Sequence, residues 1–154
     1  MAETNSQDAI ALLKQDHRTV EDLFAQFEKA SGEGRKQKLA EQICLELSVH
    51  AAIEEEIFYP ACEGKVEEDL LKESFVEHDA AKLLIAEIMT GSPDDEFYDA
   101  KVKVLGEQIE HHVEEEQEKM FPKCREAGMD MAELGKALAA RKAELMREAA
   151  EEIV

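Results

Sequence analysis

Apolar residues recur every three or four positions along four long segments of this chain, and this spacing is typical of amphipathic helices. No stretch alternates apolar with polar residues as a half-buried β-strand would. The inward positions expected in chain order are Ile10, Leu13, Val20, Phe24 and Phe27; Leu39, Ile43, Leu47 and Ile57; Leu71, Phe75, Leu84 and Ile85; and Val102, Leu105, Ile109 and Met120. The pattern predicts four main helices.

Capping and breaking residues mark the expected ends of these helices. Asn5 and Ser6 are predicted to cap the first helix, which ends near residues 31–34. The second runs from about 35 to 62, where a proline bends or frays its last turn, and the third from about 66 to 89. Pro93 suits the first turn of a fourth helix that reaches about 126, and Asp130 can cap a shorter fifth one.

Composition supports this interpretation, because Ala, Glu, Leu and Lys dominate while Gly, Pro and aromatic residues are scarce. The chain has 154 residues, enough for one domain with a sizeable core. We expect one all-α domain over residues 1–154: an up-down-up-down antiparallel four-helix bundle at about 6–127 and an additional C-terminal helix at about 130–152. That helix would pack outside as a lid or as a contact in a homo-oligomer.

Charge and cysteine content narrow the possible partners. A formal net charge of -19 repels phosphate backbones and anionic membrane surfaces, so we expect no nucleic acid or membrane partner and favour cations. Acidity alone is also typical of solvated helix faces. Three cysteines do not describe a disulfide framework, and no apolar run is long enough to span a bilayer. These features predict a cytoplasmic protein.

Each of the four main helices carries a histidine near its middle, on the apolar stripe of that helix. A rise of about 1.5 Å per residue brings His17, His50 and His78 to one height in the bundle and places His112 more loosely. One such residue would be an ordinary hydrogen-bonded core histidine, but four converging ones indicate a shared metal site. His111 has acidic and amide neighbours on the helical wheel and is predicted to lie on the surface.

Two of these histidines are followed, one turn later, by a glutamate that also faces inward, in His50-Ala-Ala-Ile-Glu54 and His112-Val-Glu-Glu-Glu116. An ionised glutamate in an apolar core costs several kcal/mol unless it is paired, and no lysine or arginine is clearly placed to pair with either. A metal resolves the conflict. Inward imidazoles and carboxylates are the ligands of di-iron and di-manganese bundle proteins.

The second and fourth helices look like an internal duplication. The His-Glu motif leads to Tyr59-Pro60 in one and, at the same distance, to Phe121-Pro122 in the other. Cys62 and Cys124 each follow two residues after the proline. The two cysteines are either a redox pair in space or small residues that fill the core.

These motifs together resemble the hemerythrin-like HHE cation-binding family over about residues 8–145. The resemblance is carried by Asp16-His17, His50-x-x-x-Glu54-Glu55 leading to Phe58-Tyr59-Pro60, Glu77-His78, and His111-His112-Val-Glu-Glu-Glu116 leading to Phe121-Pro122. It implies two non-haem iron ions joined by an oxo or hydroxo bridge. The bridging carboxylates would be Glu54 and Glu116. One iron would be bound by His17 and His50, and the other by His78 and His112.

The sequence departs from the oxygen-carrying hemerythrins at Ser74, where those proteins have a fifth histidine ligand. Either a coordination position is open to water or substrate, or another side chain such as Tyr59 fills it through a local distortion near Pro60. On an ideal helix Tyr59 faces away from His50.

The site leads to three hypotheses. The first is a non-haem di-iron protein that binds or senses O2, with turnover of peroxide or nitric oxide as a potential enzymatic activity. The second is an iron-handling or iron-dependent regulatory module. The third is a metal-free helical adaptor. Glu46, Gln108 or Ser74 is expected to orient the ligands from behind, and of the acidic runs at 54–56 and 114–116 only the inward members are expected to matter.

Overall fold

Helices make up the long elements of the computed structural model, which describes residues 8–153. They are α1 (Ala9–Lys29), α2 (Glu33–Ile53), the π-helical segment η2 (Glu54–Phe58), α3 (Tyr59–Cys62), α4 (Glu68–Thr90), α5 (Tyr98–Glu115), the π-helical segment η3 (Glu116–Met120), α6 (Phe121–Glu126) and α7 (Met131–Ile153). The described residues contain no β-strand, and the predicted all-α class is confirmed.

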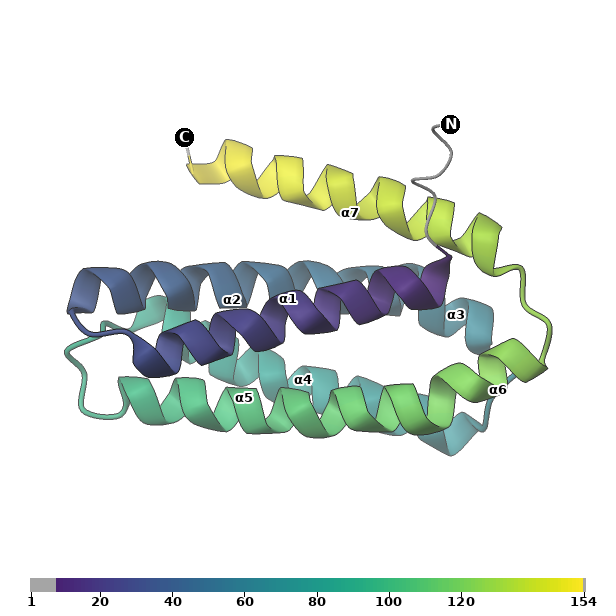
Figure 1. The fold of residues 1–154 in the computed structure, drawn as a ribbon, viewed down its shortest axis with the longest axis horizontal. Coiled ribbons are helices and arrows are strands. Elements are labelled where there is room, and N and C mark those ends of the chain that lie inside the picture. The colour runs from purple at the N-terminus through teal and green to yellow at the C-terminus, as the bar shows by residue number, and fades with distance from the viewer. Residues whose placement is uncertain (1–7, 154) are drawn as a thin grey trace.

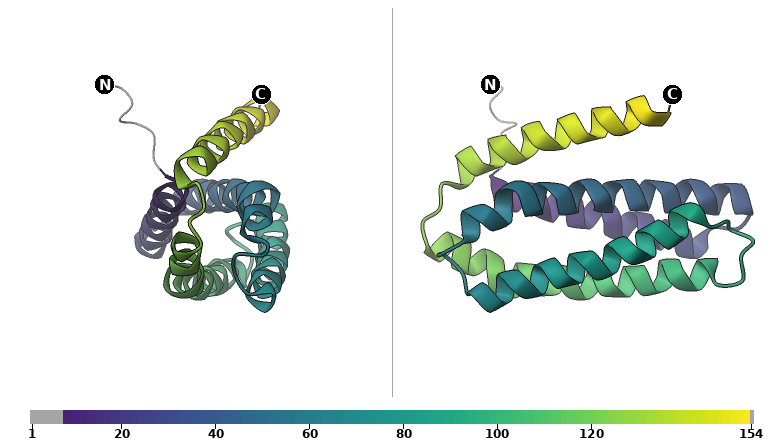
Figure 2. Two further views of the ribbon diagram at one scale, coloured as in Figure 1. Left: turned by 90° about the vertical axis from the view of Figure 1, so that its right-hand side faces the viewer. Right: turned by 180° about the vertical axis from the view of Figure 1, so that it is seen from behind.

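The four main helical segments form an antiparallel bundle (Figure 1). The chain runs along α1, back through α2, η2 and α3, along α4, and back through α5, η3 and α6. Viewed from the end of the bundle, these segments stand at the corners of a square, and α7 crosses obliquely over the α1 and α2 side (Figure 2). The up-down-up-down topology with an additional C-terminal helix is therefore confirmed. No helix in the described range is both long and apolar enough to cross a bilayer.

Three predicted helix starts can be compared with the structure. The first helix is capped by Asp8, whose carboxylate accepts a hydrogen bond from the backbone N–H of Ala11 at 2.7 Å, while the predicted caps Asn5 and Ser6 lie outside the described residues. The predicted start at Pro93 was wrong, because α5 begins only at Tyr98 after a series of turns. The cap at Asp130 is confirmed, since its carboxylate accepts the N–H of Glu133.

The two π-helical segments occupy matching positions in the duplicated helices. In η2 the N–H of Tyr59 reaches back five residues to the carbonyl of Glu54, and in η3 the N–H of Phe121 reaches back to Glu116. A proline follows each of these bonds. Proline has no N–H to donate and its ring would clash with the carbonyl four residues earlier in an α-helix, so the wider turn relieves that conflict. The predicted disturbance near Pro60 takes the form of a π-helical turn with one inserted residue.

The apolar core is divided in two. One cluster lies at the end of the bundle that contains η2, η3, α3 and α6, and includes Leu13, Phe58 and Phe121; the other lies toward the opposite end and includes Ile43 and Leu105. Polar buried residues separate these clusters. The prediction that Phe75 faces the interior is wrong in part. Its ring packs edge-on against Tyr59, but the residue is 39% exposed.

Candidate metal centre

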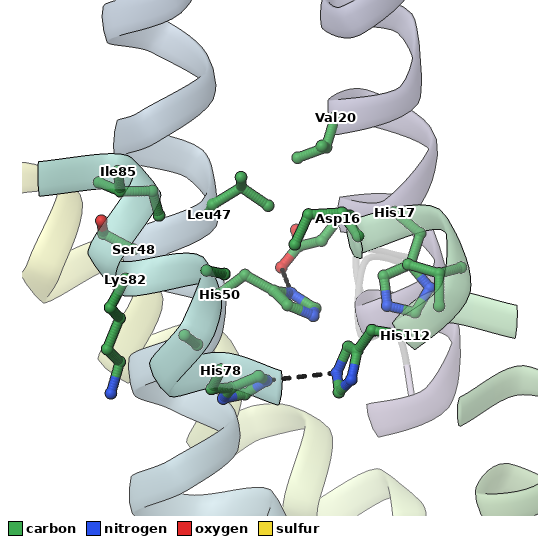
Figure 3. A pocket seen from close by; sticks show the side chains of 14 residues that line it. Asp16, His17, Val20, Leu47, Ser48, His50, His78, Lys82, Ile85 and His112 are labelled. Atoms are coloured by element: carbon green, nitrogen blue, oxygen red, sulfur yellow. Dashed lines mark hydrogen bonds and ion pairs between the residues drawn. The ribbon is translucent and has the colours of Figure 1, made fainter. Parts of the chain in front are cut away.

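Six polar residues from the four main segments meet in the layer between the two apolar clusters. They are His17 of α1, His50 of α2, Glu54 of η2, His78 of α4, His112 of α5 and Glu116 of η3, and all six are buried. Figure 3 shows the four imidazole rings pointing toward one another. The structure therefore brings together every side chain that the sequence singled out as a metal ligand.

The six residues form two overlapping groups of four potential ligands. One consists of His17, His50, Glu54 and Glu116, and the other of Glu54, His78, His112 and Glu116. Within each group the ligand atoms lie within 4.8 Å of one another. Both glutamates belong to both groups, which is the arrangement that two carboxylates shared between two cations require.

All four imidazoles are held by hydrogen bonds from Nδ1 to a residue outside these groups. The acceptors are Asp16 for His50 at 2.8 Å, Glu55 for His78 at 2.7 Å, Glu77 for His112 at 2.6 Å, and the side-chain amide oxygen of Gln117 for His17 at 2.8 Å. A carboxylate or an amide oxygen accepts but does not donate, so Nδ1 carries a proton and Nε2 faces the site, where it can bind a cation once it is itself deprotonated. This is the orientation found in metal-binding histidines.

The residues that hold the imidazoles are not the ones expected from the sequence, which were Glu46, Gln108 and Ser74. The hydroxyl of Ser74 donates a hydrogen bond to the backbone carbonyl of Leu70. The side-chain oxygen of Gln108 is buried and has no hydrogen-bond partner in the described part of the chain. No hydrogen bond to the site is found for Glu46 there. The real partners each adjoin a ligand in sequence, as in Asp16-His17 and Glu116-Gln117. A polar residue directly next to a predicted ligand was therefore the sequence feature that could have identified these partners. Glu55, expected to be solvated, contacts His78.

Tyr59 lies inside the site, against the expectation from an ideal helix. Its phenol oxygen is 2.5 Å from Glu116 Oε2, 2.9 Å from Glu54 Oε1, and 3.3 Å from the Nε2 atoms of His78 and His112. The extra residue in η2 turns the following helix by about 100°, one residue of an α-helix, and this rotation brings the ring inward. The local distortion considered for Tyr59 is therefore present.

The duplication is broken at this point, because Phe121 occupies the matching position after η3. Its ring stacks on His17 with centroids 6.1 Å apart and planes 4° apart, and it offers no oxygen. Four buried polar atoms of the site have no hydrogen bond to the described part of the molecule: Nε2 of His17, Nε2 of His50, Oε2 of Glu54 and Oε1 of Glu116. They face one another in two pairs, with His17 Nε2 3.2 Å from Glu116 Oε1 and His50 Nε2 3.2 Å from Glu54 Oε2. They all belong to one of the two groups, and a cation bound there would satisfy them.

The charges of the site also favour a cation. Among the described residues, neither Glu54 nor Glu116 pairs with a lysine or arginine. Burial would lower the pKa of His50, but Glu54 and the hydrogen bond to Asp16 raise it to about 10. Glu116 likewise raises the pKa of His112 against the effect of burial. Without a metal the raised pKa values keep His50 and His112 protonated beside the two carboxylates, and cations would replace those protons.

A small cavity of about 40 Å³ adjoins the four imidazoles (Figure 3). Its other walls are mainly apolar and include Val20, Leu47, Ile85 and Ile109. A cavity of this size holds a few water molecules or a small ligand and nothing larger. A wider surface groove between α1 and α5 shares Val20, Ile109 and Val113 with the cavity, so these three side chains stand between the site and the groove.

His111, predicted to be a surface residue, is exposed over 65% of its side chain and lies near Glu77 and Glu115. The prediction is confirmed. Its position next to the buried His112 makes it a natural control for experiments on the site.

The fold and site define a four-helix-bundle protein with a buried cluster of His and Glu side chains suited to cations. The model of the hemerythrin HHE cation-binding domain matches residues 8–124, and the chain belongs to this family. The resemblance seen in the sequence is therefore confirmed. A solved structure, a hemerythrin HHE cation-binding domain-containing protein described as an Rv2633c homolog from Mycobacterium kansasii, superimposes with a TM-score of 0.84 at 22% identity. The match covers 96% of this chain and 92% of that one, and it supports the same fold.

A curated relative is described as a DNA nickase from Nostoc sp. (strain PCC 7120 / SAG 25.82 / UTEX 2576). It is 29% identical over 121 residues, which are 79% of this chain and 34% of the relative. The chain thus spans about a third of the length of that protein.

Proposed function

We propose that this protein is a non-haem di-iron protein that binds or senses O2 and reacts with peroxide or nitric oxide. The observation that carries the proposal is the pair of four-residue groups that share Glu54 and Glu116. His17 and His50 would bind one iron, and His78 and His112 the other. Tyr59 would be a further ligand on the side of His78 and His112, because its oxygen lies 3.3 Å from both Nε2 atoms.

The pair of ions would supply electrons to a small oxidant, and the protein would control what reaches them. Phe121 provides no ligand atom beside His17, so this half of the site has fewer protein ligands and is the half where a small molecule would bind. The apolar cavity beside the imidazoles admits a diatomic molecule or a peroxide and excludes larger substrates. Asp16, Glu55, Glu77 and Gln117 hold the imidazoles in place.

DNA is a poor substrate for this chain, despite the description of the Nostoc relative. A net charge of -19 repels the phosphate backbone. The metal centre is also buried inside the bundle behind a cavity of about 40 Å³, which a nucleotide cannot enter.

A second candidate, iron-dependent regulation, is supported by the way α7 is tied to the site. Lys142 of α7 lies 2.5 Å from Asp16, the carboxylate that holds His50, and Arg141 lies 2.8 Å from Glu56 in η2. Metal occupancy at His50 can therefore influence how α7 docks on the bundle. In a regulator, iron binding would change how α7 docks on the bundle, and the protein would not consume peroxide or nitric oxide. An enzyme would consume them.

The deciding experiment combines metal analysis with optical spectroscopy and kinetics. Protein reconstituted with ferrous iron without air should bind two ions per chain, and addition of O2, peroxide or nitric oxide should change its absorption spectrum. Rapid disappearance of peroxide or nitric oxide identifies an enzyme, and a lasting spectral change with O2 identifies a carrier or sensor.

Neighbouring histidines provide a matched pair of variants. His112→Ala removes a buried imidazole of the site and should reduce iron binding strongly, while His111→Ala changes an exposed residue and should leave it unchanged. Failure of the wild-type protein to take up iron, or equal iron content in the two variants, would contradict the proposal.

A further inference from the structure

Cys62 and Cys124 are brought into contact by the fold although they are 62 positions apart in the sequence. Their Sγ atoms lie 3.5 Å apart, and both side chains are 0% exposed. Both cysteines are in the thiol form, as is Cys44, which belongs to the other apolar cluster. A disulfide has an S–S distance of about 2.05 Å, so closing the pair needs a movement of only about 1.5 Å.

The pair lies next to the metal centre. Cys62 is one turn of α3 beyond Tyr59, and Cys124 is one turn of α6 beyond Phe121. All four residues belong to the same buried cluster. The two thiols therefore join the two site-bearing segments directly behind the aromatic residues that adjoin the site. The duplication of Pro-x-Cys contributes to this arrangement, because the second and fourth segments run in the same direction and place equivalent positions at the same end of the bundle (Figure 1).

Complete burial restricts what can oxidise these thiols. A protein disulfide or another bulky oxidant cannot approach a sulfur atom with no exposed surface, so the oxidant must be small or act through the neighbouring centre. The hydrogen bond between the two thiols and burial raise the pKa of Cys62, whereas the same hydrogen bond lowers the pKa of Cys124 against the effect of burial. Metal ions bound at the adjacent site would be an alternative acceptor of electrons.

We propose that Cys62 and Cys124 are a redox-active dithiol that supplies two electrons for the reduction of a hydroperoxide at the metal centre. The two S–H bonds break and one S–S bond forms, which releases two electrons and two protons. The O–O bond of hydrogen peroxide breaks and takes up these electrons and protons, giving two molecules of water. The inference rests on the proposed function, because the peroxide is reduced at the metal ions.

Thiol counting on the intact protein tests this directly. Iron-loaded protein is prepared without air, its iron content is measured, and two equivalents of hydrogen peroxide are added, because two ferrous ions can themselves reduce the first equivalent. The sample is then unfolded in an alkylating reagent and analysed by mass spectrometry. Two of the three thiols should resist alkylation, and proteolytic peptides should show Cys62 joined to Cys124. Metal-free protein given the same amount of peroxide should keep all three thiols.

Serine variants identify the sulfur atoms involved. Cys44→Ser should still form the disulfide, whereas Cys62→Ser and Cys124→Ser should not, with iron content and helical circular dichroism retained in all three. Iron-loaded wild-type protein whose thiols survive peroxide overturns the dithiol proposal while the proposed function stands. If metal-free protein loses as many thiols to peroxide as iron-loaded protein does, the peroxide oxidises the thiols without the metal centre, and the proposal is overturned. Absence of iron uptake refutes both the proposed function and this inference, and the iron measurement separates that case from the others.

Discussion

Replacing Tyr59 with phenylalanine tests the most distinctive feature of the site. The change removes only the phenol oxygen, which lies 2.5 Å from Glu116 and 2.9 Å from Glu54, and keeps the ring that packs against Phe58 and Phe75. A phenol has one proton, so it donates to one carboxylate at a time. The loss therefore corresponds to one hydrogen bond to a charged group.

Such a bond contributes about 2 kcal/mol when its acceptor is buried. For a protein of this size each kcal/mol shifts Tm by roughly 2–4 °C, so metal-free Tyr59→Phe should melt roughly 4–8 °C below the wild type. Circular dichroism at a helical wavelength measures this. In the iron-loaded protein, the visible absorption that arises when a phenolate binds ferric iron should disappear in the variant.

Tyr98→Phe is the matched control. Tyr98 is buried in the other apolar cluster beside Phe27, and its hydroxyl makes no hydrogen bond to the described residues. The refuting result is a Tm for Tyr59→Phe no lower than that of Tyr98→Phe, together with matching visible spectra of the two iron-loaded variants. The phenol oxygen of Tyr59 would then have no role at the site, although η2 turns the ring inward.

Three further predictions follow from the surroundings of the site. Asp16→Asn should weaken iron binding by about 10–100-fold in a chelator competition, because His50 loses its carboxylate partner, whereas Asp22→Asn on the exposed side of α1 should not change it. In metal-free protein the pKa of His50 is raised to about 10 from an unfolded value of about 6.5. The stability that protonated His50 contributes is therefore fully present below about pH 6.5 and is lost as the pH rises toward 10. Urea denaturation across this pH range measures the free energy of unfolding. A free energy that stays constant or rises with pH would contradict this prediction. Val113→Ile should narrow the route between groove and cavity and slow peroxide consumption at unchanged iron content, while Val104→Ile on the exposed surface should have no effect; equal rates would exclude this route.

Much of the site was readable from helical periodicity alone. His17, His50, His78 and His112 lie on the apolar stripes of helices whose lengths place them near one level, and the spacing of four residues adds Glu54 and Glu116. These are local properties of each helix, so they follow from the order of residues without knowledge of the packing. The antiparallel order of the helices is favoured by their short connections.

The tertiary structure decided what periodicity cannot express. The inserted residue in η2 shifts the angular register after Glu54, and this brings Tyr59 inward, where an ideal wheel points it away. The partners of the imidazoles come from neighbouring helices, so Asp16, Glu55, Glu77 and Gln117 can be assigned only when the helices are packed. Contact between Cys62 and Cys124 depends on the same packing. The sequence determined which side chains face the interior, because that depends on the period of each helix. The fold determined which of them touch, because that depends on register between helices and on departures from the ideal turn.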